Sequence, residues 1–310
     1  MKIGFFGTPD FAAFFLTRLI EKYTIAFIVT AEDKPSGRHR NVHFSPVKEI
    51  AVGEGIPLYQ PSMLGDQAFI DAISSAGADL FVVVAYGKII PSEVFTLPPL
   101  KTINLHPSLL PKYRGAAPIQ WAIICGDQET GITVQLMNEK LDAGDILSQK
   151  EIPIDRDVTA GELSRIMMNR GAEFLIDTID QMARNHITPV KQNEEEATYC
   201  DKLDKELARI NWNTKAGQIH NLVRGLNPSP VAWTTFRDTT IRIWRTAIIE
   251  EEIPVSGAHG YLTAYQKKRL IVETGDGPLE ILELQPETRK VMDARSFING
   301  YRLKEGDFFQ

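Results

Sequence analysis

Hydrophobic and polar positions follow two periodicities in the first half of the chain. Compact apolar runs, typical of strands buried in a parallel sheet, occur at residues 2–6, 25–29, 79–85 and 131–137. Apolar side chains at helical spacing lie between and after them, at residues 11–20, 46–52, 67–75, 118–125 and 159–183. Strands that alternate with helices in this way predict an α/β fold with a doubly wound, mostly parallel sheet.

The pattern changes in the last third of the chain. Short alternating segments separated by Gly, Pro and Asp turns occur at residues 231–236, 240–244, 260–262, 269–273 and 279–284. Their number and spacing predict a small C-terminal β-barrel of the oligonucleotide-binding (OB-like) type. The polar stretch before it reads as a linker. The predicted domains are therefore residues 1–188, a linker at 189–206, and residues 207–310.

Composition limits the compartment and the class of partner. The chain opens directly into an apolar strand, without the order of a signal peptide, and has no apolar run long enough to span a bilayer. Its two cysteines, Cys125 and Cys200, exclude a disulfide framework, and Cys125 is expected to pack in the core. We therefore expect a cytoplasmic protein with no membrane contact and no obligatory protein partner. The net charge of −6 argues against nonspecific coating of nucleic acid, but allows a local basic patch.

The most informative stretch runs from residue 102 to residue 115. It begins as a strand, which Pro107 must end. Asn104 and His106 are two positions apart, so their side chains project from the same face at the carboxyl end of that strand, where α/β sheets bind ligands. An amide N–H and an imidazolium can both donate to an oxygen that gains negative charge. On its own, such a pair more often belongs to a hydrogen-bonded turn than to a catalytic site.

Other catalytic chemistries find little support in the sequence. The first strand carries Gly4 and Gly7 but lacks the third glycine of a dinucleotide fingerprint. No Gly-x-Ser-x-Gly nucleophile elbow occurs. Among the six histidines, only His39 and His43 have a ligand-like spacing, and no Cys or carboxylate frame surrounds them, so we expect no metal.

The string Asn-Leu-His-Pro-Ser-Leu-Leu-Pro at residues 104–111, with Arg114-Gly115 behind it, resembles the signature of folate-dependent formyltransferases. These Rossmann-like enzymes take a formyl group from 10-formyltetrahydrofolate. The run from Leu141 to Asp145 matches the family's Leu-Asp-x-Gly-Asp. The resemblance implies a catalytic trio of Asn104, His106 and Asp142, in which the carboxylate supports the imidazole. From the residues alone, Asp142 and Asp145 are equal candidates.

The same resemblance implies where the folate co-substrate lies. Its expected contacts follow the catalytic strand at Ser108, Leu109, Leu110 and Pro111. The pterin ring is expected against the backbone at Tyr86, Gly87 and Ile89 and against the loop at 138–142. A flat heteroaromatic ring favours such an apolar slot with backbone groups at its rim.

Four stretches favour the branch of the family that formylates initiator methionyl-tRNA: residues 7–12, 33–48, 202–212 and 274–286. Within them, the resemblance implies tRNA contacts by Lys34, Arg38, Arg40 and Lys205. Asn211 departs from the pattern, since an aspartate is usual there. A nucleotide-amino-sugar formyltransferase is the alternative. A non-enzymatic RNA-binding module is a third hypothesis, which leaves the string at 104–111 without a role.

Overall fold

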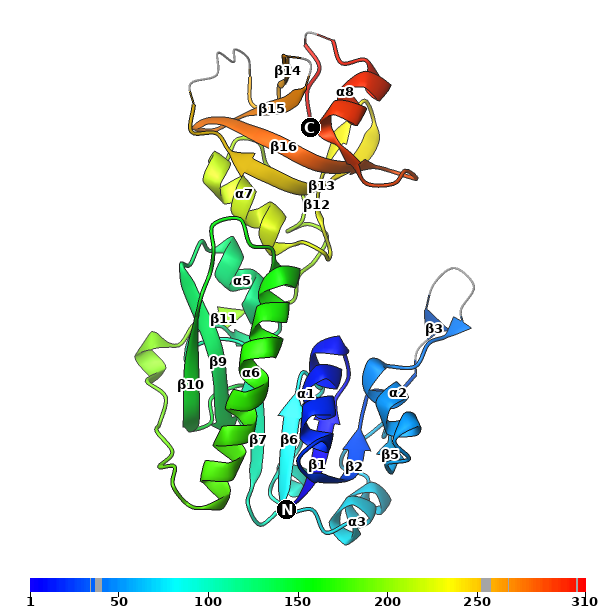
Figure 1. Cartoon of the computed structure of the whole chain (residues 1–310), viewed down its shortest axis with the longest axis vertical. Coiled ribbons are helices and arrows are strands. Elements are labelled where there is room, and N and C mark those ends of the chain that lie inside the picture. The colour runs from blue at the N-terminus through cyan, green and yellow to red at the C-terminus, as the bar shows by residue number, and fades with distance from the viewer. Residues whose placement is uncertain (34, 37–40, 252–257, 267, 305) are drawn as a thin grey trace. The chain divides into compact units, whose positions relative to one another are not determined.

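The computed structural model describes residues 1–33, 35–36, 41–251, 258–266, 268–304 and 306–310 (Figure 1). The chain forms two compact units, each built from three stretches. The first unit comprises Met1–Ala116, Thr130–Ile152 and Ser164–Cys200. The second comprises Ala117–Glu129, Pro153–Leu163 and Asp201–Gln310.

A seven-stranded sheet forms the centre of the first unit. In spatial order its strands are β10 (Ile146–Pro153), β9 (Glu129–Leu136), β7 (Thr102–His106), β6 (Leu80–Val84), β1 (Lys2–Gly7), β2 (Thr24–Val29) and β5 (Leu58–Tyr59). The run from β7 to β5 is parallel, and β9 is antiparallel to β7. All five side chains of β6 are buried, as expected for a central strand covered on both faces. The predicted mostly parallel α/β sheet is confirmed.

Helices and short strands complete the first unit. Its helices are α1 (Asp10–Ile20), α2 (Pro46–Gly53), α3 (Gln67–Ser75), α4 (Ser92–Phe95) and most of α6 (Ala160–Ala183). The short elements are β3 (Pro35–Ser36), β4 (Asn41–Val42), β8 (Arg114–Gly115), β11 (Tyr199–Cys200) and the 3₁₀ helix η1 (Glu194–Glu196). Thr159 and Glu162 exchange hydrogen bonds at the start of α6, so the predicted capping box is present.

Residues 190–200 pack along the first unit, although they lie within the predicted linker. Val190 forms a bridge with Ile146, and β11 pairs in parallel with β8. The chain therefore leaves this unit for the last time after Cys200.

An antiparallel sheet forms the centre of the second unit. Its strands follow the order β12 (Ala232–Phe236), β13 (Thr239–Ile248), β16 (Gly277–Pro286), β15 (Arg269–Thr274) and β14 (Leu262–Tyr265), with β17 (Met292–Asp293) paired to β16. The helices are α5 (Pro118–Ile124), α7 (Ala216–Gly225) and α8 (Ala294–Tyr301). Trp212, Phe236, Phe297 and Phe309 contribute large side chains to its core. The predicted short antiparallel strands are present, and β13 extends further than expected.

Cys125 is exposed at the C-cap of α5, so its predicted core position is wrong. Position 125 is three residues after the buried Ala122, but it is the C-cap, beyond the last helical residue Ile124, where helical spacing no longer determines burial. Within the described ranges, none of the helices has both the length and the hydropathy needed to cross a bilayer.

Candidate active site

The carboxyl end of β7 carries two of the three predicted catalytic residues. In the antiparallel pairing of β7 with β9, Asn104 lies opposite Gln135 and His106 opposite Thr133. Asp142 follows in the loop after β9. Its Oδ1 lies 3.3 Å from Nδ2 of Asn104 and 3.6 Å from Nδ1 of His106. The fold thus brings together three residues that no sequence spacing connects.

The Asp142 carboxylate is a shared acceptor. Its side chain is only 12% exposed. Besides the Asn104 amide, the side chain of Gln135 donates to Oδ1 at 3.3 Å, and the backbone N–H of Gly115 donates to Oδ2 at 2.9 Å. Three N–H donors therefore hold this carboxylate in place.

The His106 ring is held from two sides. It is 4% exposed, and its Nε2 lies 2.8 Å from the carbonyl oxygen of Tyr113. A carbonyl oxygen can only accept, so Nε2 carries the hydrogen. Nδ1 then faces the Asp142 carboxylate. The ring orientation is therefore fixed by a backbone group and an acidic group together.

Two glycines allow the backbone to approach closely at this site. A Cβ at Gly144 would lie 1.6 Å from the carbonyl oxygen of Leu136. Gly115 has φ +125°, and a Cβ there would lie 2.3 Å from the carbonyl oxygen of Cys200. Only glycine fits either position without moving the backbone.

Three polar side chains that the sequence analysis left without a role support the loop at 138–145. Gln135 accepts the Gly144 N–H at 3.1 Å, and Gln192 donates to the Asp142 carbonyl at 2.8 Å. Gln192 in turn accepts from Arg114. A signal was available for Gln135, because it is the one amide side chain in the mostly apolar run at 131–137. Arg114 and Gln192 lie too far apart in sequence for any pattern to link them.

The segment predicted to contact folate after β7 is tightly bonded to the sheet. Thr133 donates to the Ser108 carbonyl at 2.7 Å and accepts the Leu110 N–H at 3.1 Å. The side chain of Gln149 donates to the Leu110 carbonyl at 2.8 Å. The side chains of Ser108 and Leu110 are buried, whereas those of Leu109 and Pro111 are half-buried. Two side chains of this segment therefore remain partly accessible.

The predicted pterin region follows β6. Tyr86 is 3% exposed, and burial raises the pKa of its phenol to about 12. Gly87 turns the backbone with φ +80°. Ile89 is 88% exposed, and Leu141, beside Asp142, is 62% exposed. This end of the sheet thus presents apolar side chains to solvent beside the trio's loop.

The structure describes only one of the four predicted tRNA contacts. Lys34, Arg38 and Arg40 lie outside the described residues. Lys205 belongs to the second unit, where its carbonyl accepts from the indole of Trp233 at 3.0 Å. In the described part of the chain, no group of three His, Cys, Asp or Glu side chains is arranged to hold a metal ion.

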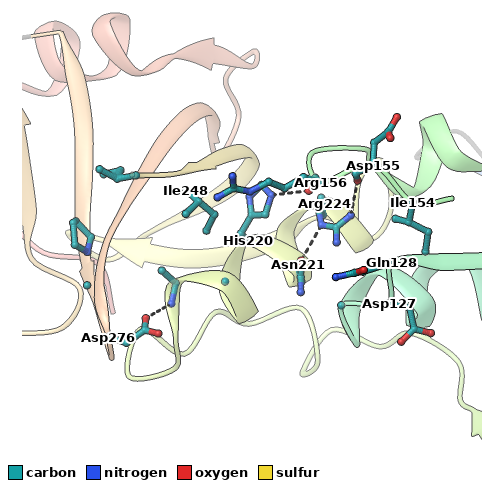
Figure 2. Close-up of a pocket in the computed structure, with 16 residues that line it drawn as sticks. Asp127, Gln128, Ile154, Asp155, Arg156, His220, Asn221, Arg224, Ile248 and Asp276 are labelled. Atoms are coloured by element: carbon teal, nitrogen blue, oxygen red, sulfur yellow. Dashed lines mark hydrogen bonds between the residues drawn. The ribbon is translucent and has the colours of Figure 1, made fainter. Parts of the chain in front are cut away.

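The second unit contains a cavity of about 880 Å³ beside α7 (Figure 2). His220 lines it, with Nδ1 at 2.9 Å from the Thr246 hydroxyl and Nε2 at 3.2 Å from the Arg156 carbonyl. Arg224 donates to the side chain of Asn221 at 2.9 Å and to the Asp155 carbonyl at 3.4 Å. Burial lowers the pKa of both His220 and Arg224.

Two family models match the chain, "Formyl transferase" at residues 1–179 and "Formyl transferase, C-terminal domain" at residues 202–302. The chain is 42% identical over 307 residues to the methionyl-tRNA formyltransferase of Clostridium acetobutylicum, covering 99% of this chain and 98% of that protein. It is 45% identical over 305 residues to that of Thermodesulfovibrio yellowstonii, covering 98% and 97%.

Solved structures share the fold at lower identity. The sugar 3N-formyl transferase WlaRD, crystallised with dTDP and 5-N-formyl-THF, is 20% identical with a TM-score of 0.69, covering 94% of this chain and 99% of that one. HypX from Aquifex aeolicus in complex with tetrahydrofolic acid is 18% identical with a TM-score of 0.67. That match covers 100% of this chain and 50% of the other.

Proposed function

Because the chain belongs to the methionyl-tRNA formyltransferase family, we propose that it transfers the formyl group of 10-formyltetrahydrofolate to the amino group of methionine on initiator methionyl-tRNA. The observation that carries the proposal is the convergence of Asn104, His106 and Asp142 at the carboxyl end of β7. Transfer is direct: the amine nitrogen bonds to the formyl carbon, and the bond from that carbon to the folate nitrogen breaks. The amine loses a proton, and the folate nitrogen gains one.

Asn104 is the proposed donor to the formyl oxygen. Its amide has two N–H groups, and one of them is directed at Asp142. The second can donate to the oxygen as negative charge develops on it. A fixed donor at such a position typically contributes about 10²–10³ in rate.

His106 and Asp142 complete the proposed chemistry. In its protonated form the imidazole stabilises the same developing charge, and the carboxylate opposite Nδ1 fixes the orientation of the ring. The Tyr113 carbonyl keeps the ring from turning. In this arrangement His106 acts through its charge and its fixed orientation, while Asn104 supplies the direct hydrogen bond.

The proposed folate site lies along Ser108, Leu109, Leu110 and Pro111 and against Tyr86, Gly87 and Ile89. The exposed apolar side chains of Ile89 and Leu141 support it, because a pterin ring gains by covering such surface. Backbone groups in the turn at Gly87 are suited to the ring's polar edge.

We propose that Lys34, Arg38 and Arg40 from the loop at 31–46 bind the RNA, together with Lys205. Lysine and arginine contacts to phosphates position an RNA, and an arginine can also reach base edges. The same proposal divides the chain into a first domain at 1–188, a linker at 189–206 and a last domain at 207–310. The first domain performs the transfer, and the last domain binds tRNA. Initiator tRNA is used in translation, so we propose that the protein acts in the cytoplasm.

The test is to mix the purified protein with charged initiator methionyl-tRNA and 10-formyltetrahydrofolate and to measure formyl-methionine. A nucleotide-linked amino sugar in a parallel reaction tests the alternative substrate. We expect formylation of the tRNA only, with an apparent affinity for tRNA that falls steeply as salt rises. Formylation of the sugar, with no transfer to tRNA, would overturn the proposal.

A further inference from the structure

The side chain of Gln192 connects the loop of the proposed catalytic trio to a buried arginine. Its Nε2 lies 2.8 Å from the Asp142 carbonyl and 2.8 Å from the Gly144 carbonyl. The same nitrogen lies 3.2 Å from Oε1 of Gln135, the side chain that also donates to the Asp142 carboxylate. The Gln192 amide thus contacts the backbone of Asp142 and also Gln135, a side chain that donates to the Asp142 carboxylate.

The orientation of this amide follows from its neighbours. Oε1 of Gln192 accepts from Arg114 at 3.1 Å (Nε) and 2.8 Å (Nη2). A guanidinium can only donate and carbonyl oxygens can only accept. The carbonyl side of the amide therefore faces Arg114, and its NH₂ side faces the loop.

Arg114 holds the Gln192 amide in a fixed position. Its side chain is 1% exposed, and its guanidinium makes two further hydrogen bonds, of 3.0 and 2.9 Å, to the Glu194 carboxylate at the surface. Hydrogen bonding to Glu194 raises the pKa of Arg114. The paired, planar guanidinium is thereby held in one position.

The loop needs such a restraint because of its backbone. Asp142 has φ +48°, in the left-handed region that non-glycine residues rarely adopt. Gln192 donates to the carbonyl of that residue and to the carbonyl two residues later, so it bonds to the backbone on the C-terminal side of the turn. A loop without these two bonds is free to relax and to move the carboxylate away from Asn104.

We infer that Gln192, held by Arg114, is a positioning residue that fixes the Asp142 carboxylate for formyl transfer. This inference rests on the proposed function for its effect on rate. It concerns a residue 50 positions beyond Asp142, in the last stretch of the first unit. Gln192 touches no reacting group and acts only through the loop.

The Gln192→Glu variant removes the donor side of the amide and keeps its acceptor side. A carboxylate keeps an acceptor for Arg114 but places an oxygen opposite the carbonyls of Asp142 and Gly144, where no donor remains. We expect kcat for formyl transfer to fall about 10–100-fold, since small displacements of a catalytic group have effects of this size. The KM values for folate and for tRNA should stay within about threefold, because the residue contacts neither substrate.

Matched variants guard against a general loss of structure. Glu195→Gln, at an exposed neighbour, should leave kcat unchanged, and Gln192→Ala should lower it, since it removes both loop bonds without adding charge. Far-UV circular dichroism checks that each variant is folded. An unaltered kcat in both folded Gln192 variants would overturn the inference.

A double-mutant cycle tests whether the effect passes through Asp142. If it does, Gln192→Glu should lower kcat by less than about twofold in an Asp142→Asn background. An equal loss in both backgrounds would contradict the positioning role.

Amide hydrogen exchange provides a readout that does not need the proposed reaction. The Gly115 N–H donates to Asp142, so its exchange should accelerate in Gln192→Glu and stay unchanged in Glu195→Gln. Unchanged exchange at Gly115 in the folded Gln192→Glu variant would overturn the inference. Failure of the proposed function would instead appear as a wild-type protein without formyl transfer.

Discussion

The two units each bury an arginine beside a titratable group, and the two settings differ in their partners. In the first unit, Arg114 bonds to a carboxylate and to the Gln192 amide, and the pKa of its guanidinium is raised. In the second, Arg224 bonds to backbone carbonyls and to Asn221, and burial lowers its pKa. One charge is compensated by a nearby anion, whereas the other depends mainly on neutral oxygens.

The titratable residues of the two clusters, Asp142 and His220, also differ in their hydrogen-bond partners. Asp142 receives hydrogen bonds from Asn104, Gln135 and Gly115, three donors from separate segments of the first unit. His220 contacts the Thr246 hydroxyl and the Arg156 carbonyl, and its Nε2 lies 3.3 Å from the Asp157 carboxylate. These partners join α7 to β13 and to the segment at 153–159. The donors around Asp142 meet at a single side chain, whereas the partners of His220 are spread over two elements and hold them together, which is a structural role.

The largest difference between the clusters should appear when Asp142 is changed to Asn. Without the negative charge, the His106 imidazolium and the Asn104 amide lose their common partner, so we expect kcat to fall about 10²–10³-fold with little change in melting temperature. Steady-state formylation and thermal unfolding measure the two quantities. The matched Arg224→Lys variant should change kcat far less. Equal losses of kcat in the two variants would contradict the assignment of a catalytic role to the Asp142 cluster and a structural role to the Arg224 cluster.

Gly144→Ala should damage the first cluster through its backbone. The added Cβ would meet the Leu136 carbonyl, so we expect a destabilisation of about 1–3 kcal/mol together with a loss of formyl transfer. Gly217 in α7 is the control, because a Cβ there meets nothing within 4 Å. Gly217→Ala should be neutral or stabilising by up to about 1 kcal/mol.

Fluorescence can assign the destabilisation to one unit. All four tryptophans, at 121, 212, 233 and 244, lie in the second unit, so their emission reports its unfolding separately from far-UV circular dichroism. Gly144→Ala should shift the circular-dichroism transition of the first unit. A shift confined to tryptophan emission would contradict this explanation.

The smallest expected effect is a pH dependence that belongs to His220. Burial lowers its folded-state pKa below the ordinary value of 6.5, so the unfolded chain binds the proton more readily. Its contribution to stability is complete above pH 6.5 and is lost as pH falls from there towards the folded-state pKa. Urea unfolding followed by tryptophan emission measures this trend. In His220→Gln the loss over that range should be smaller, and an equal pH dependence in both proteins would refute the assignment.

The sequence predicted the fold well because local patterns determine it. The structure contains strands at the run 79–85 and at the segment that carries Asn104 and His106, as predicted. It also contains the predicted capping box of Thr159 and Glu162 at the start of α6. The polar partners of the site were harder to foresee. Gln192 reaches the loop because Val190 forms a bridge with Ile146 and β11 pairs with β8, and these contacts depend on the tertiary fold. Cys125 was misplaced because an apolar run does not reveal where α5 ends.

The central claim is that Asn104, aligned by Asp142, stabilises the charge that develops during formyl transfer. The most direct test is the single-turnover rate of formyl-methionyl-tRNA formation by Asn104→Ala, with folate affinity measured in parallel. We predict a rate about 10²–10³-fold below that of the wild type, with folate affinity nearly unchanged. A rate within about threefold of the wild type, in a folded variant that binds folate, would contradict the claim.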